Sequence, residues 1–200
     1  MMNLAFLVSN NGSSLRAVVA AIADGKLAAR ARLVVSNRAA APALAFAAER
    51  GIPTLCLPTV ADPEGADARL CDALDSAKAD LVILSGYLRR LGPITLGAYA
   101  GRVLNIHPAL LPNYGGKGMY ERRVHEAVIA ARETETGATV HVVDDQYDHG
   151  PVVAQARISI GPNDTAETIE ARVMAEEPGL FIRTLNEIAA GRLVLPRITP

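Results

Sequence analysis

The chain has 200 residues, of which 50% are hydrophobic and 20% charged, a composition that suits one globular domain. Its formal net charge is -1, so it lacks the basic excess that nucleic-acid-binding and membrane-surface proteins usually carry. The N-terminal apolar run is too short for a signal peptide, and no stretch of about twenty apolar residues is present to span a bilayer. We therefore expect a cytoplasmic protein that binds neither nucleic acid nor a membrane.

The first half of the chain alternates short apolar runs with segments of helical periodicity. The apolar runs predict strands buried on both faces, at 4–8, 33–35, 54–57 and 81–84. The helical patterns run from Ser13 to just before Gly25, then over 42–50 and 66–77. This alternation predicts a parallel α/β sheet with helices on both faces.

The second half of the chain departs from this alternation. Its expected elements are a strand at 103–106, a loop rich in proline and glycine at 112–118, a helix at 119–131, and strands at 139–143 and 152–158. The polar segment between the last two strands suits a hairpin-like connection, so we expect the mostly parallel sheet to have an antiparallel portion here. Asp164 or Thr165 is placed to cap a final long helix that ends near Gly191.

A polar turn, Ser9-Asn10-Asn11-Gly12-Ser13-Ser14, joins the first expected strand to the first expected helix. A helix N-terminus presents unpaired N–H groups and the positive end of the helix dipole, which favours a bound anion. Gly12 would allow close approach of a ligand, and the hydroxyls of Ser13 and Ser14 add donors. The turn has neither the P-loop lysine nor a GxGxxG pattern, so it predicts a site for a small phosphate monoester. An ordinary turn with a serine cap is the alternative.

Two polar residues, Asn105 and His107, end the strand that opens the second half. Residues two apart in a strand point to the same side, and ligands of open α/β sheets bind at the carboxyl ends of the strands. An asparagine amide can donate to a developing oxyanion, and a histidine can hold or pass a proton near neutral pH. A polar pair with purely structural partners is the competing interpretation.

The acidic loop 144–150 carries Asp148, which we expect to raise the pKa of His107 if the two side chains meet. A solvated acidic turn explains the same residues, because aspartate and glycine are common in turns. The other histidines carry weaker signals: His125 suits packing on a helix, His141 lies inside a strand, and His149 follows Asp148.

The spacing of cysteines and histidines gives no sign of a metal site. Cys56 and Cys71 are isolated, which is typical of reduced thiols in a reducing compartment. The 4 histidines form no motif such as HExxH, so we expect no metal.

Taken together, these segments resemble the phosphoribosylglycinamide formyltransferase family, and the resemblance covers almost the whole chain. It rests on the anion turn, on a Ser-Gly-Tyr-Leu-Arg-Arg-Leu segment, on the Asn-Ile-His-Pro strand end and on the long acidic-loop signature, at 11–13, 85–91, 105–112 and 137–151. The resemblance implies a Rossmann-like formyltransferase fold forming one domain over 1–200. Its phosphate-binding half would be about 1–100, and its catalytic and folate half about 101–200.

The resemblance also implies an activity and a set of site residues. The enzyme would move a formyl group from 10-formyltetrahydrofolate, its co-substrate, to the amine of phosphoribosylglycinamide in purine biosynthesis, as a monomer or homodimer. Asn105, His107 and Asp148 would be catalytic, and Glu177 would lie near the ribose and glycinamide. The substrate phosphate would bind Asn11, Gly12, Ser13 and Ser14. The folate would bind Leu88, Arg89, Arg90, Leu91, Asn105, Val143, Asp144, Asp145, Gln146, Tyr147 and Asp148.

The chain departs from the family pattern at a few positions. Asn10 replaces a common glycine, Ser14 a common asparagine, and Pro178 a histidine that usually follows the glutamate. The loop 114–120 is longer than in some relatives and its glycines predict mobility over the site. An arginine that some relatives use for the folate tail is missing near Pro63.

Other activities on the same fold are alternatives. An amino-sugar nucleotide acceptor would need a nucleotide pocket, and relatives that act on methionyl-tRNA are longer and more basic. A formyltetrahydrofolate hydrolase would use water as acceptor and usually carries a further N-terminal domain. A non-catalytic binding protein would have no need of the three polar residues Asn105, His107 and Asp148.

Overall fold

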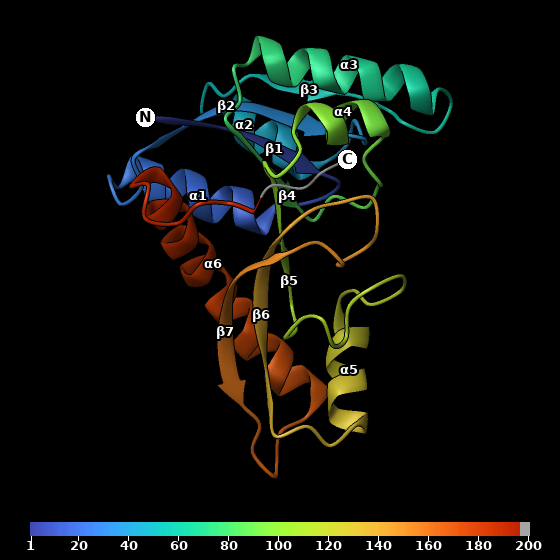
Figure 1. The fold of residues 1–200 in the computed structure, drawn as a ribbon, viewed down its shortest axis with the longest axis vertical. Helices are drawn as coiled ribbons and strands as arrows, with labels where there is room; N and C mark the ends of the chain where they lie inside the picture. Colours follow the sequence, from blue (N-terminus) through green and yellow to red (C-terminus); the bar gives the residue numbers. More distant parts are fainter. Residues whose placement is uncertain (197–200) are drawn as a thin grey trace.

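A seven-stranded sheet in the order β3-β2-β1-β4-β5-β6-β7 runs through the computed structural model, which describes residues 1–196 (Figure 1). Its first five members in this order are parallel, and β6 pairs antiparallel with both β5 and β7. Along the chain the elements are β1 (Met2–Val8), α1 (Ser13–Ala23), β2 (Ala29–Ser36), α2 (Pro42–Ala48), β3 (Thr54–Cys56), α3 (Pro63–Ser76), β4 (Leu81–Ser85), α4 (Pro93–Ala98), β5 (Val103–His107), α5 (Arg122–Ala130), β6 (Glu135–Val142), β7 (Val152–Ser159) and α6 (Ala166–Ala189).

Two hydrophobic cores lie on the two faces of the parallel part. Along β1, Leu4, Phe6 and Val8 belong to one core, while Ala5 and Leu7 belong to the other. This alternation follows from the strand geometry, in which successive side chains point to opposite faces. The first core packs against α1, α2 and α6, and the second against α3 and α4, so the parallel strands are covered on both sides (Figure 1). The predicted α/β architecture, mostly parallel with an antiparallel C-terminal portion, is therefore confirmed.

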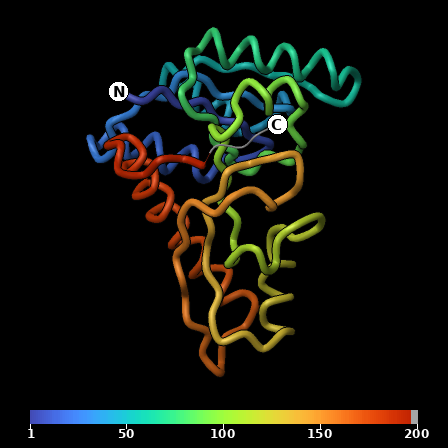
Figure 2. The backbone as a smooth tube through the Cα atoms, in the orientation of Figure 1, coloured from blue at the N-terminus to red at the C-terminus, as the bar shows by residue number. Residues whose placement is uncertain are grey.

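The antiparallel part extends away from this layered body. The strands β5, β6 and β7 continue beyond the helices α3 and α4, with α5 and α6 packed beside them (Figures 1 and 2). The long helix α6 contacts α1, α5, β6 and β7, so it joins the two parts of the molecule. Thr165 caps α6 through a capping box with Thr168, which confirms the expected start of this helix.

Several elements differ from those predicted. The helix α5 begins at Arg122 and not at 119, because Glu121 has a positive φ of 54° that helical backbone does not allow. The strand β6 begins at Glu135, four residues before the predicted start at 139, because it pairs with β7 from that residue onward. The short helix α4 was not predicted.

The helix α4 depends on a tertiary contact. The buried carboxylate of Asp67, on α3, accepts hydrogen bonds from the N–H groups of Ile94 and Thr95 at 2.8 and 3.1 Å. These are first-turn donors that have no partner inside the helix. A residue 27 positions away in the sequence thus caps α4, which local periodicity does not reveal.

Candidate active site

A cavity of about 540 Å³ opens at the carboxyl ends of β4 and β5. Ligands of open α/β sheets bind at this edge. Four segments line the cavity, at 84–91, 105–108, 116–121 and 141–148. The loops that follow β5 and β6 project to the same side of the molecule, yellow-green and orange in Figure 2. All eleven residues that the sequence assigned to folate line this cavity.

The structure brings together the three residues predicted to be catalytic. Asn105 and His107 lie at the end of β5, and the carboxylate of Asp148 lies in the loop between β6 and β7. The Asp148 Oδ2 atom is 3.5 Å from His107 Nδ1. On the other side of the ring, His107 Nε2 donates to the carbonyl of Tyr114 at 2.8 Å. Each ring nitrogen therefore faces an acceptor.

The loop after β5 holds Asp148 in place. The Gly116 N–H donates to Asp148 Oδ2 at 3.0 Å. A Cβ atom on Gly115 would lie 2.5 Å from a Leu111 methyl carbon and 3.0 Å from the Asp148 Cβ, so only glycine fits this close approach. Asp148 itself has a positive φ of 54°, a conformation that is costly for a residue with a side chain.

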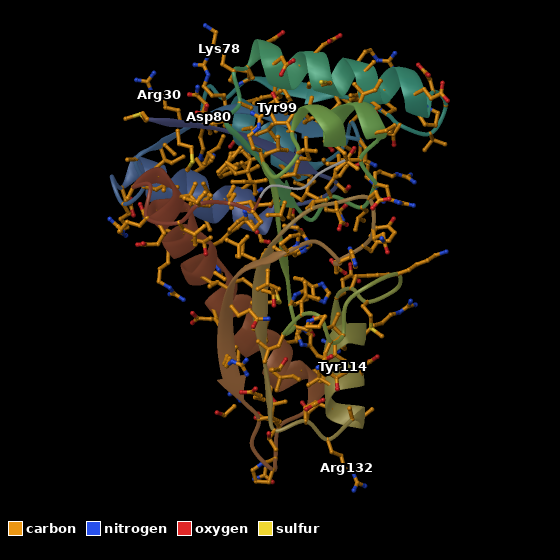
Figure 3. All side chains as sticks on the ribbon, in the orientation of Figure 1. Arg30, Lys78, Asp80, Tyr99, Tyr114 and Arg132 are labelled. Atoms are coloured by element: carbon orange, nitrogen blue, oxygen red, sulfur yellow. The ribbon has the colours of Figure 1, made fainter. Side chains whose placement is uncertain are left out.

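The loop after β5 is also anchored to the turn that follows α5. Tyr114 lies beside α5, and its hydroxyl donates to Glu133, in the turn between α5 and β6, at 2.6 Å (Figure 3). Tyr114 also supplies the carbonyl that His107 contacts, so the loop links this turn to the imidazole ring.

A fourth polar residue, His141, completes this cluster, although no motif in the sequence assigned it a role. It lies opposite Asn105 in the antiparallel pairing of β5 and β6. The Asn105 amide nitrogen donates to His141 Nε2 at 3.1 Å, and His141 Nδ1 lies 3.1 Å from the carbonyl of Val142. Burial lowers the pKa of His141, although nearby Asp148 acts in the opposite direction. Only the strand register shows that these residues meet.

The segment 88–91 faces the acidic loop across the cavity. The Arg90 guanidinium donates to the carbonyl of Asp145 and lies 5.7 Å from the centre of the Tyr147 ring. Leu88 is half exposed, at 50%, and lines the cavity. The two segments that the sequence assigned to folate therefore meet, although 55 residues separate Arg90 from Asp145.

The polar turn before α1 has the backbone of an anion site. Gly12 is the N-cap residue with a positive φ of 65° and makes no side-chain cap bond, while the Leu15 N–H donates to Ser85 Oγ at 2.9 Å. The turn is joined to the folate segment, because the Leu88 N–H donates to Ser9 Oγ at 2.8 Å. A cation also lies beside it: Arg38 donates to Asn10 Oδ1 at 2.8 Å. The sequence did not single out Arg38, because no motif marks it.

Glu177 lies on α6, outside the residues that line the cavity. It is partly buried, and desolvation raises its pKa from 4.5 to about 7. Pro178 follows it within the helix, where it lacks the N–H group that would donate to the preceding turn.

Within residues 1–196, no group of three or more histidine, cysteine, aspartate or glutamate side chains is arranged to hold a metal ion. His149 is exposed and pairs with Asp144 at 2.8 Å. None of the helices in the described part of the chain is long and apolar enough to cross a membrane.

Comparison with known proteins identifies the class of enzyme to which this fold and cavity correspond. A family model described as Formyl transferase matches residues 2–185. The chain belongs to the formyl transferase family.

Individual relatives within this family carry a more specific name than the family itself. A phosphoribosylglycinamide formyltransferase of Escherichia coli is 37% identical over 194 residues, covering 96% of this chain and 89% of the relative. A chloroplastic phosphoribosylglycinamide formyltransferase of Vigna unguiculata is also 37% identical, and the chain spans 62% of its length.

The solved structures agree with these relatives. Phosphoribosylglycinamide formyltransferase of Coxiella burnetii, in complex with CHES, has a TM-score of 0.87 at 40% identity, over 96% of this chain and 88% of that one. Glycinamide ribonucleotide transformylase 1 of Symbiobacterium toebii has a TM-score of 0.88 at 32% identity, over 100% and 95% of the two chains. A formyltetrahydrofolate deformylase of Pseudomonas syringae shares the fold at 23% identity.

Proposed function

We propose that this protein transfers the formyl group of 10-formyltetrahydrofolate to the amine of phosphoribosylglycinamide, a formylation step of purine biosynthesis. The observation that carries the proposal is the meeting of Asn105, His107 and Asp148 at the edge of one cavity. The similarity to enzymes named for this reaction supports it over nearly the whole chain.

The reaction forms one C–N bond and breaks another. The neutral substrate amine attacks the formyl carbon, and the carbonyl electron pair moves to oxygen to give a tetrahedral oxyanion. When this intermediate collapses, the bond to folate N10 breaks, and the proton lost by the attacking amine ends on N10. No metal or covalent enzyme intermediate takes part.

The polar residues at the cavity edge match the needs of this intermediate. The Asn105 amide and protonated His107 would donate to the oxyanion, and Asp148 would keep His107 charged and oriented. Loss of one oxyanion donor typically lowers the rate by about 10²–10³. His107, or a water that it orders, would relay the proton to the leaving nitrogen.

The remaining contacts would place the two substrates. The folate would occupy the cavity between Leu88–Leu91 and Val143–Asp148. The ribotide phosphate would bind the N–H groups of the Gly12–Ser14 turn, with Arg38 as an additional cation. Glu177 would lie toward the ribose and the glycinamide.

The test is a spectroscopic transfer assay with 10-formyl-5,8-dideazafolate and phosphoribosylglycinamide. Release of the deformylated folate should require the ribotide and should collapse in the Asp148→Asn variant. Release without the ribotide would instead identify a hydrolase. No release by folded protein that still binds the folate would point to another acceptor, such as an amino-sugar nucleotide.

We also propose a cytoplasmic location and a monomeric or homodimeric state. Both cysteines are free thiols, which suits a reducing compartment. Light scattering coupled to size-exclusion chromatography would give the mass in solution, and a trimer or larger assembly would contradict the proposed state.

A further inference from the structure

A chain of hydrogen bonds connects a backbone carbonyl to the amide of Asn105. His141 stands in the middle of this chain: its Nδ1 atom is 3.1 Å from the Val142 carbonyl, and its Nε2 atom is 3.1 Å from the Asn105 amide nitrogen. The imidazole is only 2% exposed, so water does not compete strongly for either contact. The pairing of β5 with β6 holds the two residues directly opposite each other.

The Val142 carbonyl determines the tautomer of this ring. A carbonyl can only accept, so His141 Nδ1 must carry the hydrogen. In the neutral ring Nε2 then has a lone pair and can only accept. Asn105 must therefore present its NH2 group, because the opposite orientation would set its amide oxygen against that lone pair.

Burial favours the neutral form of His141, against the two carboxylates that lie near it. Burial lowers its pKa, and the positive charge that His107 can carry acts in the same direction. The carboxylates of Asp148 and Asp144 act in the opposite direction. Asp148 lies between the two rings, with Oδ1 3.6 Å from His141 Nε2 and Oδ2 3.5 Å from His107 Nδ1. Two charged rings sharing one carboxylate would repel each other, which further disfavours a second proton on His141.

We propose that His141 is a positioning residue that fixes the orientation of the Asn105 carboxamide and leaves its second N–H group for the oxyanion. This inference rests on the proposed function, because it assigns the Asn105 amide its role in that reaction. Without His141 the carboxamide can rotate by half a turn, and its oxygen would then repel the developing negative charge.

The first test separates positioning from packing. In His141→Leu, kcat should fall by about 10²-fold, the effect of losing one oxyanion donor, while KM for both substrates changes little. His141→Gln should retain much of kcat, since its amide oxygen can accept from Asn105. His125→Leu is the matched control: this ring is also buried, at 1% exposed, but its Nδ1 has no hydrogen-bond partner in the described structure. The control should keep its kcat.

A double-mutant cycle identifies the partner. If His141 acts only through Asn105, the variant carrying both Asn105→Ala and His141→Leu should be no slower than Asn105→Ala alone, within about threefold. The proposal would be overturned if the kcat loss of the double variant equalled the product of the two single losses. An unchanged kcat in His141→Leu would overturn it as well.

The second test needs no turnover. Nitrogen-15 NMR of the imidazoles in the ligand-free protein should show His141 protonated at Nδ1 and unprotonated at Nε2 between about pH 6 and pH 8. A ring protonated at Nε2 would overturn the proposal even in an active formyltransferase. If the protein shows the expected tautomer but no ribotide-dependent transfer, the proposed function is wrong, while the assigned role of His141 in orienting Asn105 is not contradicted.

Discussion

The two halves of the site use different parts of the chain, side chains in one and backbone N–H groups in the other. The cluster of Asn105, His107, His141 and Asp148 consists of side chains that contact one another, and two of these, His107 and His141, are almost fully buried. The turn at Gly12 consists of backbone N–H groups at the start of α1, and its N-cap residue has no side chain. From this comparison we expect the chemistry to depend on individual side chains, and the turn at Gly12 to depend on its backbone conformation and to tolerate side-chain changes such as Asn10 and Ser14.

The largest effect is expected at the carboxylate of the cluster. Asp148→Asn keeps the shape of the side chain but removes the charge beside His107, so kcat should fall by about 10³-fold. Steady-state kinetics with both substrates at saturation would measure the loss. Asp24→Asn, at the far end of α1, is the control and should keep full activity. A loss below about tenfold would show that His107 does not need the carboxylate.

The backbone of the anion turn is probed by Gly12→Ala. The substitution forces a side chain into a φ of 65° and places its Cβ 3.2–3.3 Å from Val8, Ala43 and Leu15. The turn must shift, so KM for the ribotide should rise about tenfold, while the Kd for folate should stay nearly constant.

A second glycine with a positive φ serves as the control, because it distinguishes the effect of backbone strain from an effect on ribotide binding. Gly25 has a similar φ of 70°, but a Cβ there would meet nothing within 4 Å. Gly25→Ala should therefore lose about 1 kcal/mol of stability and leave KM for the ribotide unchanged. Equal KM changes in both variants would mean that the turn at Gly12 is not the phosphate site.

The raised pKa of Glu177 predicts a pH-dependent stability. Its folded-state pKa, about 7, is above its ordinary value of 4.5. This carboxyl therefore contributes no penalty below about pH 4.5, destabilises the fold progressively between pH 4.5 and 7, and exerts its full penalty above pH 7. Glu177→Gln should increase the free energy of unfolding by about 2 kcal/mol near pH 8.5 and leave it unchanged near pH 4.

Urea unfolding at the two pH values measures this difference. The neighbouring Glu176, which pairs with Arg183 at 2.7 Å on the surface, is the control. Glu176→Gln should show no gain at the higher pH, because its carboxylate remains solvated. If both variants gain the same free energy of unfolding at the higher pH, Glu177 is not desolvated in the folded protein.

The smallest effect is expected from a side chain of the anion turn. Ser13→Ala removes an exposed hydroxyl but keeps the N–H group, so KM for the ribotide should rise no more than about fivefold, in line with one hydrogen bond of about 1 kcal/mol. Ser76→Ala, at the end of α3, should leave KM unchanged. A rise of about a hundredfold would show that this turn, like the cluster, depends on its side chains.

The sequence by itself determined the layered architecture and one half of the cluster. Strands buried on both faces and helices with one apolar side leave periodic patterns, because each periodicity records which side chains avoid water. The alternation thus predicted the parallel part of the sheet, and the polar connection after 143 predicted its antiparallel end. Spacing of two residues likewise placed Asn105 and His107 on one side of β5.

Only the tertiary structure decided which distant groups meet. The contact of His107 with Asp148, the pairing of Asn105 with His141, the cap that Asp67 gives to α4 and the bond from Arg38 to Asn10 each join separate segments. Periodicity reports burial along one segment, but such contacts depend on strand order, register and loop path. These are set by packing across the whole sheet, so no local pattern in the chain encodes them.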